Sequence, residues 1–307
     1  MRASRRSAAT TKASHANPTV ATDGRVVAAF FGSEGLFVLN AVSGKTLWTH
    51  DFGTLSLGLK GDRGSEWGFA SSPVLFEGSV VVQCDTHDRA FVAAHELRTG
   101  KQRWMVKRDE YPAWSTPTVF EGAGGPLLIT SSSRQTRAQN ARTGAEVWSF
   151  ADETEVRVPA PLVAGDRVVI GGGYPSGRRF FALDARTGKL LWDNASGGPY
   201  TPTPVAWGQH LFICGDNGVL GCYTLADGKR VFQQRLPKPG SFSASPVVAE
   251  GRLFLASEDG EIHVVKASPE YTVVASNTMP EGVWATPAPA GKTLYIRTSA
   301  ALYAIRA

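Results

Sequence analysis

The sequence has few cysteines, little charge and no long hydrophobic run. Of its 307 residues, 3 are cysteine and 19% are charged. No stretch reaches the roughly 18 apolar residues of a membrane-spanning helix, so we expect no transmembrane segment. The hydrophobic content of 42% is too high for a disordered chain, so we expect a folded core.

Positive charge is concentrated at the N-terminus. The formal net charge is +5, but residues 1–16 hold four basic residues and no acidic residue. Nucleic-acid binding needs basic residues clustered on the folded surface, so we expect no nucleic-acid partner. The same segment lacks the apolar stretch of a secretory signal. Two explanations stay open: the protein remains in the cytoplasm, or the chain begins downstream of its true start.

The three cysteines, Cys84, Cys214 and Cys222, show no zinc-ligand spacing. Cys214 and Cys222 flank an Asn-Gly dipeptide, which favours a two-residue hairpin turn. Such a turn would pair Cys222 with Ile213 and turn the side chain of Cys214 to the other face of the sheet. We therefore expect no disulfide bond and three small buried side chains.

The chain does contain a repeat with a period of about 42 residues. Each unit has a small residue before a proline, a Gly-containing connection, two apolar runs separated by a turn, and a final Gly-centred turn. The prolines that mark the units are Pro18, Pro73, Pro117, Pro161, Pro204, Pro246 and Pro287. This period, built only from strands, is typical of a four-stranded propeller blade. We predict an all-β β-propeller with seven recognisable units (seven or eight blades in the intact protein) as a single domain over 17–307, with 1–16 unstructured or a partial closing segment.

Two units depart from this pattern. In the third, the second run is the polar segment 135–139, so this strand is either exposed or satisfied by polar partners. It is either a degenerate copy or a binding element. The seventh unit supplies three strands, near 286–288, 293–297 and 302–305, and lacks an outer strand. An unpaired edge of this kind favours self-association.

The end of each unit resembles the repeat of pyrroloquinoline-quinone (PQQ)-type propellers. The clearest copy, ALDARTGKLLW at 182–192, is similar to the A-x-D-x-x-T-G-K-x-x-W signature of that family. Weaker copies end at Trp48, Trp104, Trp148 and Phe232. We expect these four aromatic residues and Trp192 to pack between neighbouring blades, because a repeated large ring usually contributes buried area.

Longer stretches, such as WSTPTV and SASPVVAEGRLFLASEDGEIHVVKA, are similar to a bacterial group of PQQ-like repeat proteins. Members of that group are generally longer at the N-terminus and carry an export signal. The resemblance therefore implies a periplasmic or otherwise exported protein. At a distance, the chain also resembles the propeller lipoprotein that assists outer-membrane protein assembly, which implies a scaffold that binds other proteins.

The same family includes quinoprotein dehydrogenases, which hold PQQ and Ca²⁺ and enclose the quinone between a Trp and an adjacent Cys–Cys pair. Here no two cysteines are adjacent, and no Glu, Asn and Asp set fits the family's positions. We therefore disfavour PQQ with calcium and expect no cofactor. No nucleophile elbow is present, and the group Asp85, His87 and Asp88 is more typical of a solvated turn than of a metal site. We expect no catalytic or metal-binding residues.

Aromatic residues recur just ahead of successive inner strands. They are Trp67, Trp114, Tyr200, Phe242 and Trp284, and Arg157 takes the corresponding place in the fourth unit. In a propeller these positions converge around the central channel, where they either plug the channel or bind a partner. Trp, Tyr and Arg are enriched in binding hot spots, and Arg63 and Glu66 of the insertion 54–66 would lie at the rim.

Our hypothesis is a non-enzymatic binding or scaffold propeller that engages a protein or peptide through the face around the channel. The first alternative is a PQQ-dependent oxidoreductase. The second is an enzyme of unrelated chemistry that uses the channel mouth. A fold of this kind hosts many functions, so the residues at the site must decide between them.

Overall fold

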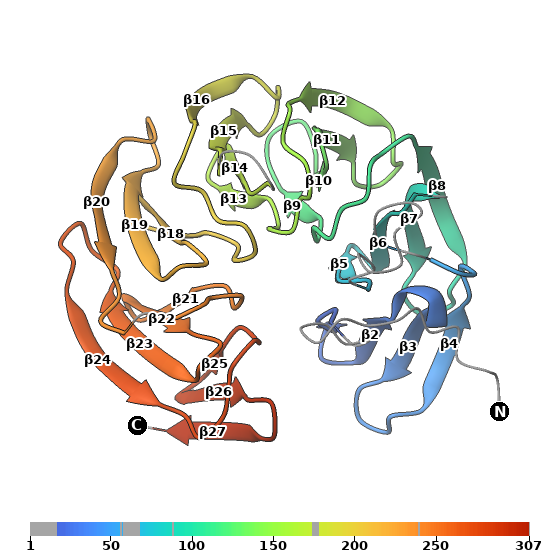
Figure 1. Cartoon of the computed structure of the whole chain (residues 1–307). Coiled ribbons are helices and arrows are strands. Elements are labelled where there is room, and N and C mark those ends of the chain that lie inside the picture. Colours follow the sequence, from blue (N-terminus) through green and yellow to red (C-terminus); the bar gives the residue numbers. More distant parts are fainter. Residues whose placement is uncertain are drawn as a thin grey trace. The chain divides into compact units, whose positions relative to one another are not determined.

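The computed structural model describes residues 17–55, 57, 68–87, 89–173, 178–238 and 240–306. Within these ranges the regular structure is almost entirely β, with one short 3-10 turn, η1 (Gly32–Glu34). No helix in this part of the chain has the length and apolar character needed to cross a membrane. The strands form seven antiparallel sheets in which strands consecutive in sequence pair (Figure 1). The prediction of an all-β propeller fold made of repeated blades is confirmed.

The first three sheets have four strands each. The first contains β1 (Ala21–Thr22), β2 (Val26–Phe30), β3 (Leu36–Asn40) and β4 (Thr46–His50). The second contains β5 (Val74–Phe76), β6 (Ser79–Asp85), β7 (Ala90–Glu96) and β8 (Gln102–Arg108). The third contains β9 (Thr118–Phe120), β10 (Leu127–Ser132), β11 (Gln135–Asn140) and β12 (Glu146–Ala151).

Three more four-stranded sheets and one three-stranded sheet follow. The fourth contains β13 (Leu162–Ala164), β14 (Arg167–Gly171), β15 (Phe180–Asp184) and β16 (Leu190–Asn194). The fifth contains β17 (Val205–Trp207), β18 (His210–Cys214), β19 (Val219–Thr224) and β20 (Arg230–Arg235). The sixth contains β21 (Val247–Ala249), β22 (Arg252–Ala256), β23 (Glu261–Lys266) and β24 (Val273–Thr278). The seventh contains β25 (Ala288–Ala290), β26 (Thr293–Arg297) and β27 (Leu302–Arg306).

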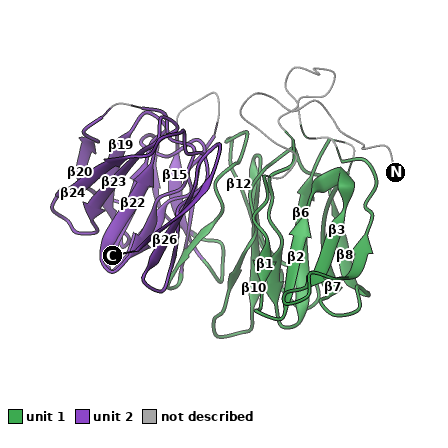
Figure 2. Cartoon of the chain, turned by 90° about the horizontal axis from the view of Figure 1, so that it is seen from below, with its two compact units in different colours: residues 1–166, 185–189 green, residues 167–184, 190–307 purple. Residues whose placement is uncertain are grey.

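By its contacts, the chain divides into two compact units (Figure 2). Unit 1 comprises residues 1–166 and 185–189, and unit 2 comprises 167–184 and 190–307. The boundary falls within the fourth sheet, so the single domain over 17–307 stays a prediction. The terminal segment 1–16 lies outside the described residues.

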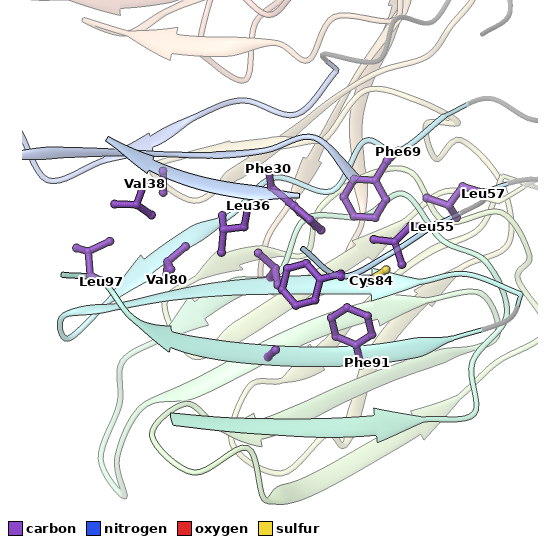
Figure 3. Close-up of a cluster of buried hydrophobic side chains, with 14 of the residues drawn as sticks. Phe30, Leu36, Val38, Leu55, Leu57, Phe69, Val80, Cys84, Phe91 and Leu97 are labelled. Carbon is purple, nitrogen blue, oxygen red and sulfur yellow. The ribbon is translucent and has the colours of Figure 1, made fainter. Parts of the chain in front are cut away.

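The second strand of most blades is largely buried, whereas only Thr293 and Ile296 are buried on β26 of the seventh. All seven residues of β6 are buried, and Val80, Val81 and Val82 are fully covered. Strands covered on both faces are expected to carry such continuous apolar runs. The cluster between the first two sheets also takes in Leu55 and Leu57, so the start of the 54–66 insertion is anchored in the core (Figure 3).

All three cysteines are free and buried, as predicted, but the predicted hairpin register is wrong. Cys222 pairs with Phe212, and Cys214 pairs with Leu220, so the two cysteines lie on the same face of the sheet. The turn spans 215–218, closed by a backbone hydrogen bond, and is longer than the two-residue loop that the Asn-Gly pair favours. Burial raises the pKa of the Cys222 thiol to about 11, so the thiol stays protonated and behaves as a small hydrophobe.

The seventh sheet has three strands among the described residues, as predicted, although its first strand begins at residue 288. Its last strand, β27, lies at the edge of the sheet. Leu302 and Ile305 on this strand are 68% and 45% exposed. The sheet therefore ends on an edge with accessible apolar side chains.

Candidate functional site

The aromatic residue near the end of a blade lies over the glycine turn of the next blade. A Cβ atom on Gly100 would lie 2.7 Å from the indole of Trp48, and the Nε1 of Trp48 donates a 2.9 Å hydrogen bond to the carbonyl oxygen of Leu97. The equivalent stacked pairs are Trp104 with Gly144, Trp148 with Gly188, and Trp192 with Gly228. Each ring packs one blade against the next, and this packing holds in place the loop that connects the two blades.

The fifth blade has a ring–ring contact at this position. Phe232 is partly buried, and its ring centroid lies 5.6 Å from that of Tyr271 on the sixth blade. Trp104, Trp148 and Trp192 are 9%, 8% and 8% exposed, so the indoles are nearly covered. Their burial is consistent with the packing role expected from the sequence.

In unit 1, two of the predicted binding residues are buried. Trp114 is 7% exposed, and its Nε1 donates a 2.9 Å hydrogen bond to the carbonyl oxygen of Gly68. Arg157 is 0% exposed, and its Nη2 contacts both carboxylate oxygens of Asp152 at 2.6 Å. The backbone N–H of Trp114 donates to the carbonyl oxygen of Arg157 at 2.8 Å, so the two residues brace one another. Trp67, with Arg63 and Glu66, lies outside the described residues.

In unit 2, the predicted residues differ in accessibility. Phe242 is 1% exposed, Tyr200 is partly buried, and Trp284 is 42% exposed. The indole of Trp284 lies over the backbone of Gly282, where a Cβ atom would come within 2.9 Å of the ring. The indole therefore lies against the chain on one side while the residue stays accessible.

An exposed cation–π pair in unit 1 was missed by the sequence analysis. Tyr111 is 57% exposed, and the guanidinium carbon of Arg134 lies 4.8 Å from the centre of its ring. Arg134 also forms an ion pair with Glu155. The sequence drew attention to the polar run that contains Arg134, but Tyr111 precedes a proline outside the repeated aromatic position and gave no signal of its own.

The backbone beneath this pair is held in an uncommon conformation. Val156 has a φ of 54°, which is strained for a β-branched residue. Its N–H donates a 2.9 Å hydrogen bond to the Oγ of Ser133, which in turn donates to the carbonyl oxygen of Pro112 at 2.6 Å. The backbone N–H of Arg134 donates a 2.7 Å hydrogen bond to the carbonyl oxygen of Thr154 in the next loop. The three loops therefore present Tyr111 and Arg134 on a rigid support.

The polar strand of the third blade is largely buried and only partly satisfied by polar partners, so it is not the exposed strand that the sequence left open. Within the described part of the chain, Thr136 Oγ1 and Gln139 Oε1 have no hydrogen-bond partner. Arg137 on β11 is paired with Glu110 and Glu146. Burial raises the pKa of Glu110, although the hydrogen bond from Arg137 acts in the opposite direction. This strand thus contributes to a network of charged side chains that supports the neighbouring loops.

Asp85 is the centre of a second buried network between the second and third sheets. It pairs with Arg108, and it accepts 2.7 Å hydrogen bonds from the Nε2 of Gln83 and the Oγ of Ser132. Asp85 is 1% exposed, so the expectation that it belongs to a solvated turn is wrong. Asp88 lies outside the described residues, and within the described part of the chain no three His, Cys, Asp or Glu side chains form a metal-binding group.

The family comparison fits this architecture. The model of the family described as outer membrane protein assembly factor BamB matches residues 32–230 and 181–307. The chain belongs to this family. A search of curated proteins finds no match.

Solved structures show the same BamB-type fold at low sequence identity. BamB from Moraxella catarrhalis has a TM-score of 0.72 and 13% identity, over 92% of this chain and 82% of that one. A europium-containing methanol dehydrogenase has a TM-score of 0.70 and 14% identity, over 91% of this chain and 72% of that one. The computationally designed Ika8 protein has a TM-score of 0.58 and 13% identity, over 94% and 95%. Identities this low establish the propeller fold and leave function to the residues of the site.

Proposed function

We propose that this BamB-family chain is a non-enzymatic binding propeller that engages a protein or peptide through the face around the channel mouth. The observation that carries the proposal is Trp284, a residue that is 42% exposed and whose indole lies against Gly282. A Trp side chain has few rotatable bonds, so it can bury a large area on binding at a modest cost in conformational entropy.

Tyr111 and Arg134 supply a second accessible contact of the same kind. Both residue types are common in hot spots, and the ion pair with Glu155 already orders the Arg134 side chain. Trp114, Arg157 and Phe242 are buried, and we assign them the role of holding these loops in place. Loops held on a rigid scaffold are where propellers commonly carry function.

We further propose that the protein acts in the periplasm or at the outer membrane, as part of outer-membrane protein assembly. The family description supports this location and this class of partner. A PQQ-dependent oxidoreductase remains the alternative, and it rests on the fold shared with methanol dehydrogenase.

Site-specific photo-crosslinking tests the binding face. A crosslinker placed at position 284 should capture discrete envelope proteins. In the chain without a crosslinker, Trp284→Ser and Tyr111→Ser should each weaken co-purification of the same proteins. Trp207 is the matched control because it is 43% exposed but lies on β17 of the fifth sheet, whereas Trp284 precedes the seventh sheet. Equal capture at positions 207 and 284, with no effect of either serine variant, would contradict the proposal.

Cofactor titration tests the alternative. If the chain is an oxidoreductase, PQQ added with Ca²⁺ or a lanthanide ion should bind and raise the melting temperature, since a ligand that binds only the folded state stabilises it. The binding proposal predicts no shift. A saturable rise, together with alcohol-dependent dye reduction, would replace the binding function by the enzymatic one.

A further inference from the structure

His95 is a buried histidine of the second sheet. It lies on β7 and is 0% exposed, and within the described part of the chain neither Nδ1 nor Nε2 has a hydrogen-bond partner. A neutral imidazole carries one N–H donor and one acceptor nitrogen. Leaving both unsatisfied in the core is costly, so this ring calls for an explanation beyond packing.

A second imidazole lies against it. The ring centroids of His50 and His95 are 4.6 Å apart, with an interplanar angle of 49°. His50 ends β4 of the first sheet, whereas His95 belongs to the second sheet, and both sheets are part of unit 1. His50 is partly exposed, so the pair has one solvent-facing side.

The surrounding residues hold this pair in place. Trp48 lies two residues before His50 on the same face of β4, and its indole is fixed by the hydrogen bond to the carbonyl oxygen of Leu97, two residues after His95. The ring of Phe52 lies 4.4 Å from His50 and 5.7 Å from His95, measured between centroids. Aromatic contacts on several sides limit the rotation of both imidazoles.

We propose that His50 and His95 together bind one divalent transition-metal ion, Zn²⁺ or Cu²⁺, with solvent completing the coordination shell. Imidazole nitrogen is a preferred ligand of both ions. An ion about 2.0–2.1 Å from each nitrogen places two adjacent imidazole centroids roughly 5 Å apart, close to the separation in this pair.

The pair supplies two protein ligands to the ion. No third His, Cys, Asp or Glu ligand joins the pair among the described residues. Two protein ligands and open solvent positions suit an exchangeable ion, and such an ion would link the first two blades.

Calorimetric titration of untagged, chelator-treated protein with Zn²⁺, and separately with Cu²⁺, tests the site. The wild type should bind one ion with micromolar affinity, and its melting temperature should rise with metal concentration. His50→Ala and His95→Phe should each weaken binding by at least about tenfold. His210→Ala, which removes a partly exposed histidine of unit 2, should leave binding unchanged and serves as the matched control.

His50 is the decisive position because it is partly exposed, so its replacement should preserve the fold even if His95→Phe does not fold. Circular dichroism and the melting temperature without metal check this point. Equal affinity of the wild type and His50→Ala would overturn the proposal, as would the absence of saturable binding in the wild type. A loss of affinity in His50→Ala with His210→Ala unaffected would support it.

Discussion

Gly188 lies beneath the indole of Trp148, so close that a Cβ atom at position 188 would sit 2.6 Å from the ring. Gly188 also has a φ of 70°, in the left-handed region that L side chains rarely adopt. The indole Nε1 of Trp148 donates a 3.0 Å hydrogen bond to the carbonyl oxygen of Ala185 in the same turn. The T-G-K turn of the repeat is thus the surface against which the aromatic residue of the preceding blade packs.

Replacing this glycine should destabilise the protein through two effects. Gly188→Ala adds backbone strain at positive φ and a clash with Trp148, and we expect a loss of about 2–4 kcal/mol in the free energy of unfolding. Gly165→Ala is the matched control, because Gly165 has a φ of 61° but nothing within 4 Å of its Cβ position. Urea denaturation measures both variants. A loss for Gly188→Ala no larger than for the control would mean that the indole contact contributes nothing.

Removing a docking indole should create a cavity between blades. Trp192 is 8% exposed, and Trp192→Ala should lower the free energy of unfolding by about 3–5 kcal/mol. Trp207→Ala removes the same side chain from a site that is 43% exposed, and it should cost less than about 1 kcal/mol. Similar losses for the two variants, measured by chemical denaturation, would show that Trp192 has no special packing role.

The stability of unit 2 should depend on pH through His263. This ring is 0% exposed, its Nδ1 lies 2.8 Å from the Oγ of Ser276, and burial lowers its pKa below the ordinary value of 6.5. A depressed histidine pKa means that the unfolded chain takes up the proton first. The stabilising contribution is therefore complete above about pH 6.5 and is lost as the pH falls below that value.

The comparison of wild type with His263→Leu isolates this effect. Leucine fills the site with an apolar side chain of similar size. Ser276, which loses its contact with the imidazole, is exposed and can form a hydrogen bond to water. The free energy of unfolding of the wild type should fall more steeply from pH 7 to pH 5 than that of the variant. Parallel pH profiles in denaturant titrations would show that His263 does not titrate differently in the folded and unfolded states.

The sequence predicted the blades well because each strand and turn is a local pattern that repeats. It could not predict the hairpin register at Cys214, where one additional loop residue changes which side chains face each other. It also could not show which aromatic residues remain accessible. Trp114 and Trp284 occupy equivalent places in their repeats, yet one is 7% and the other 42% exposed. Trp114 is bonded to the carbonyl oxygens of Gly68 and Arg157, two contacts distant in sequence that no local pattern predicts.

The same limit applies to residues whose partners are distant in sequence. Arg157 is fully buried because Asp152 neutralises it, and the sequence alone gave no measure of that burial. The pairing of Tyr111 with Arg134 and of His50 with His95 brings together residues from separate strands or blades. Neither pair has a spacing that a sequence motif would reveal.

The edge of the seventh sheet should support self-association. Edge strands offer unpaired backbone groups, and β27 adds the exposed side chains of Leu302 and Ile305. We expect the wild type to associate as its concentration rises, and Leu302→Lys to shift the protein toward monomer, because a lysine on an edge strand opposes pairing with a second copy. Leu302 is 68% exposed, so this change should leave the melting temperature nearly unchanged.

Val42→Lys, at a position 92% exposed in a turn outside the edge strand, adds the same charge and should not alter association. Sedimentation velocity over a concentration series measures the association of all three proteins. The edge would be closed to pairing if the wild type stayed monomeric throughout. The same would follow if the Leu302→Lys variant associated as well as the wild type.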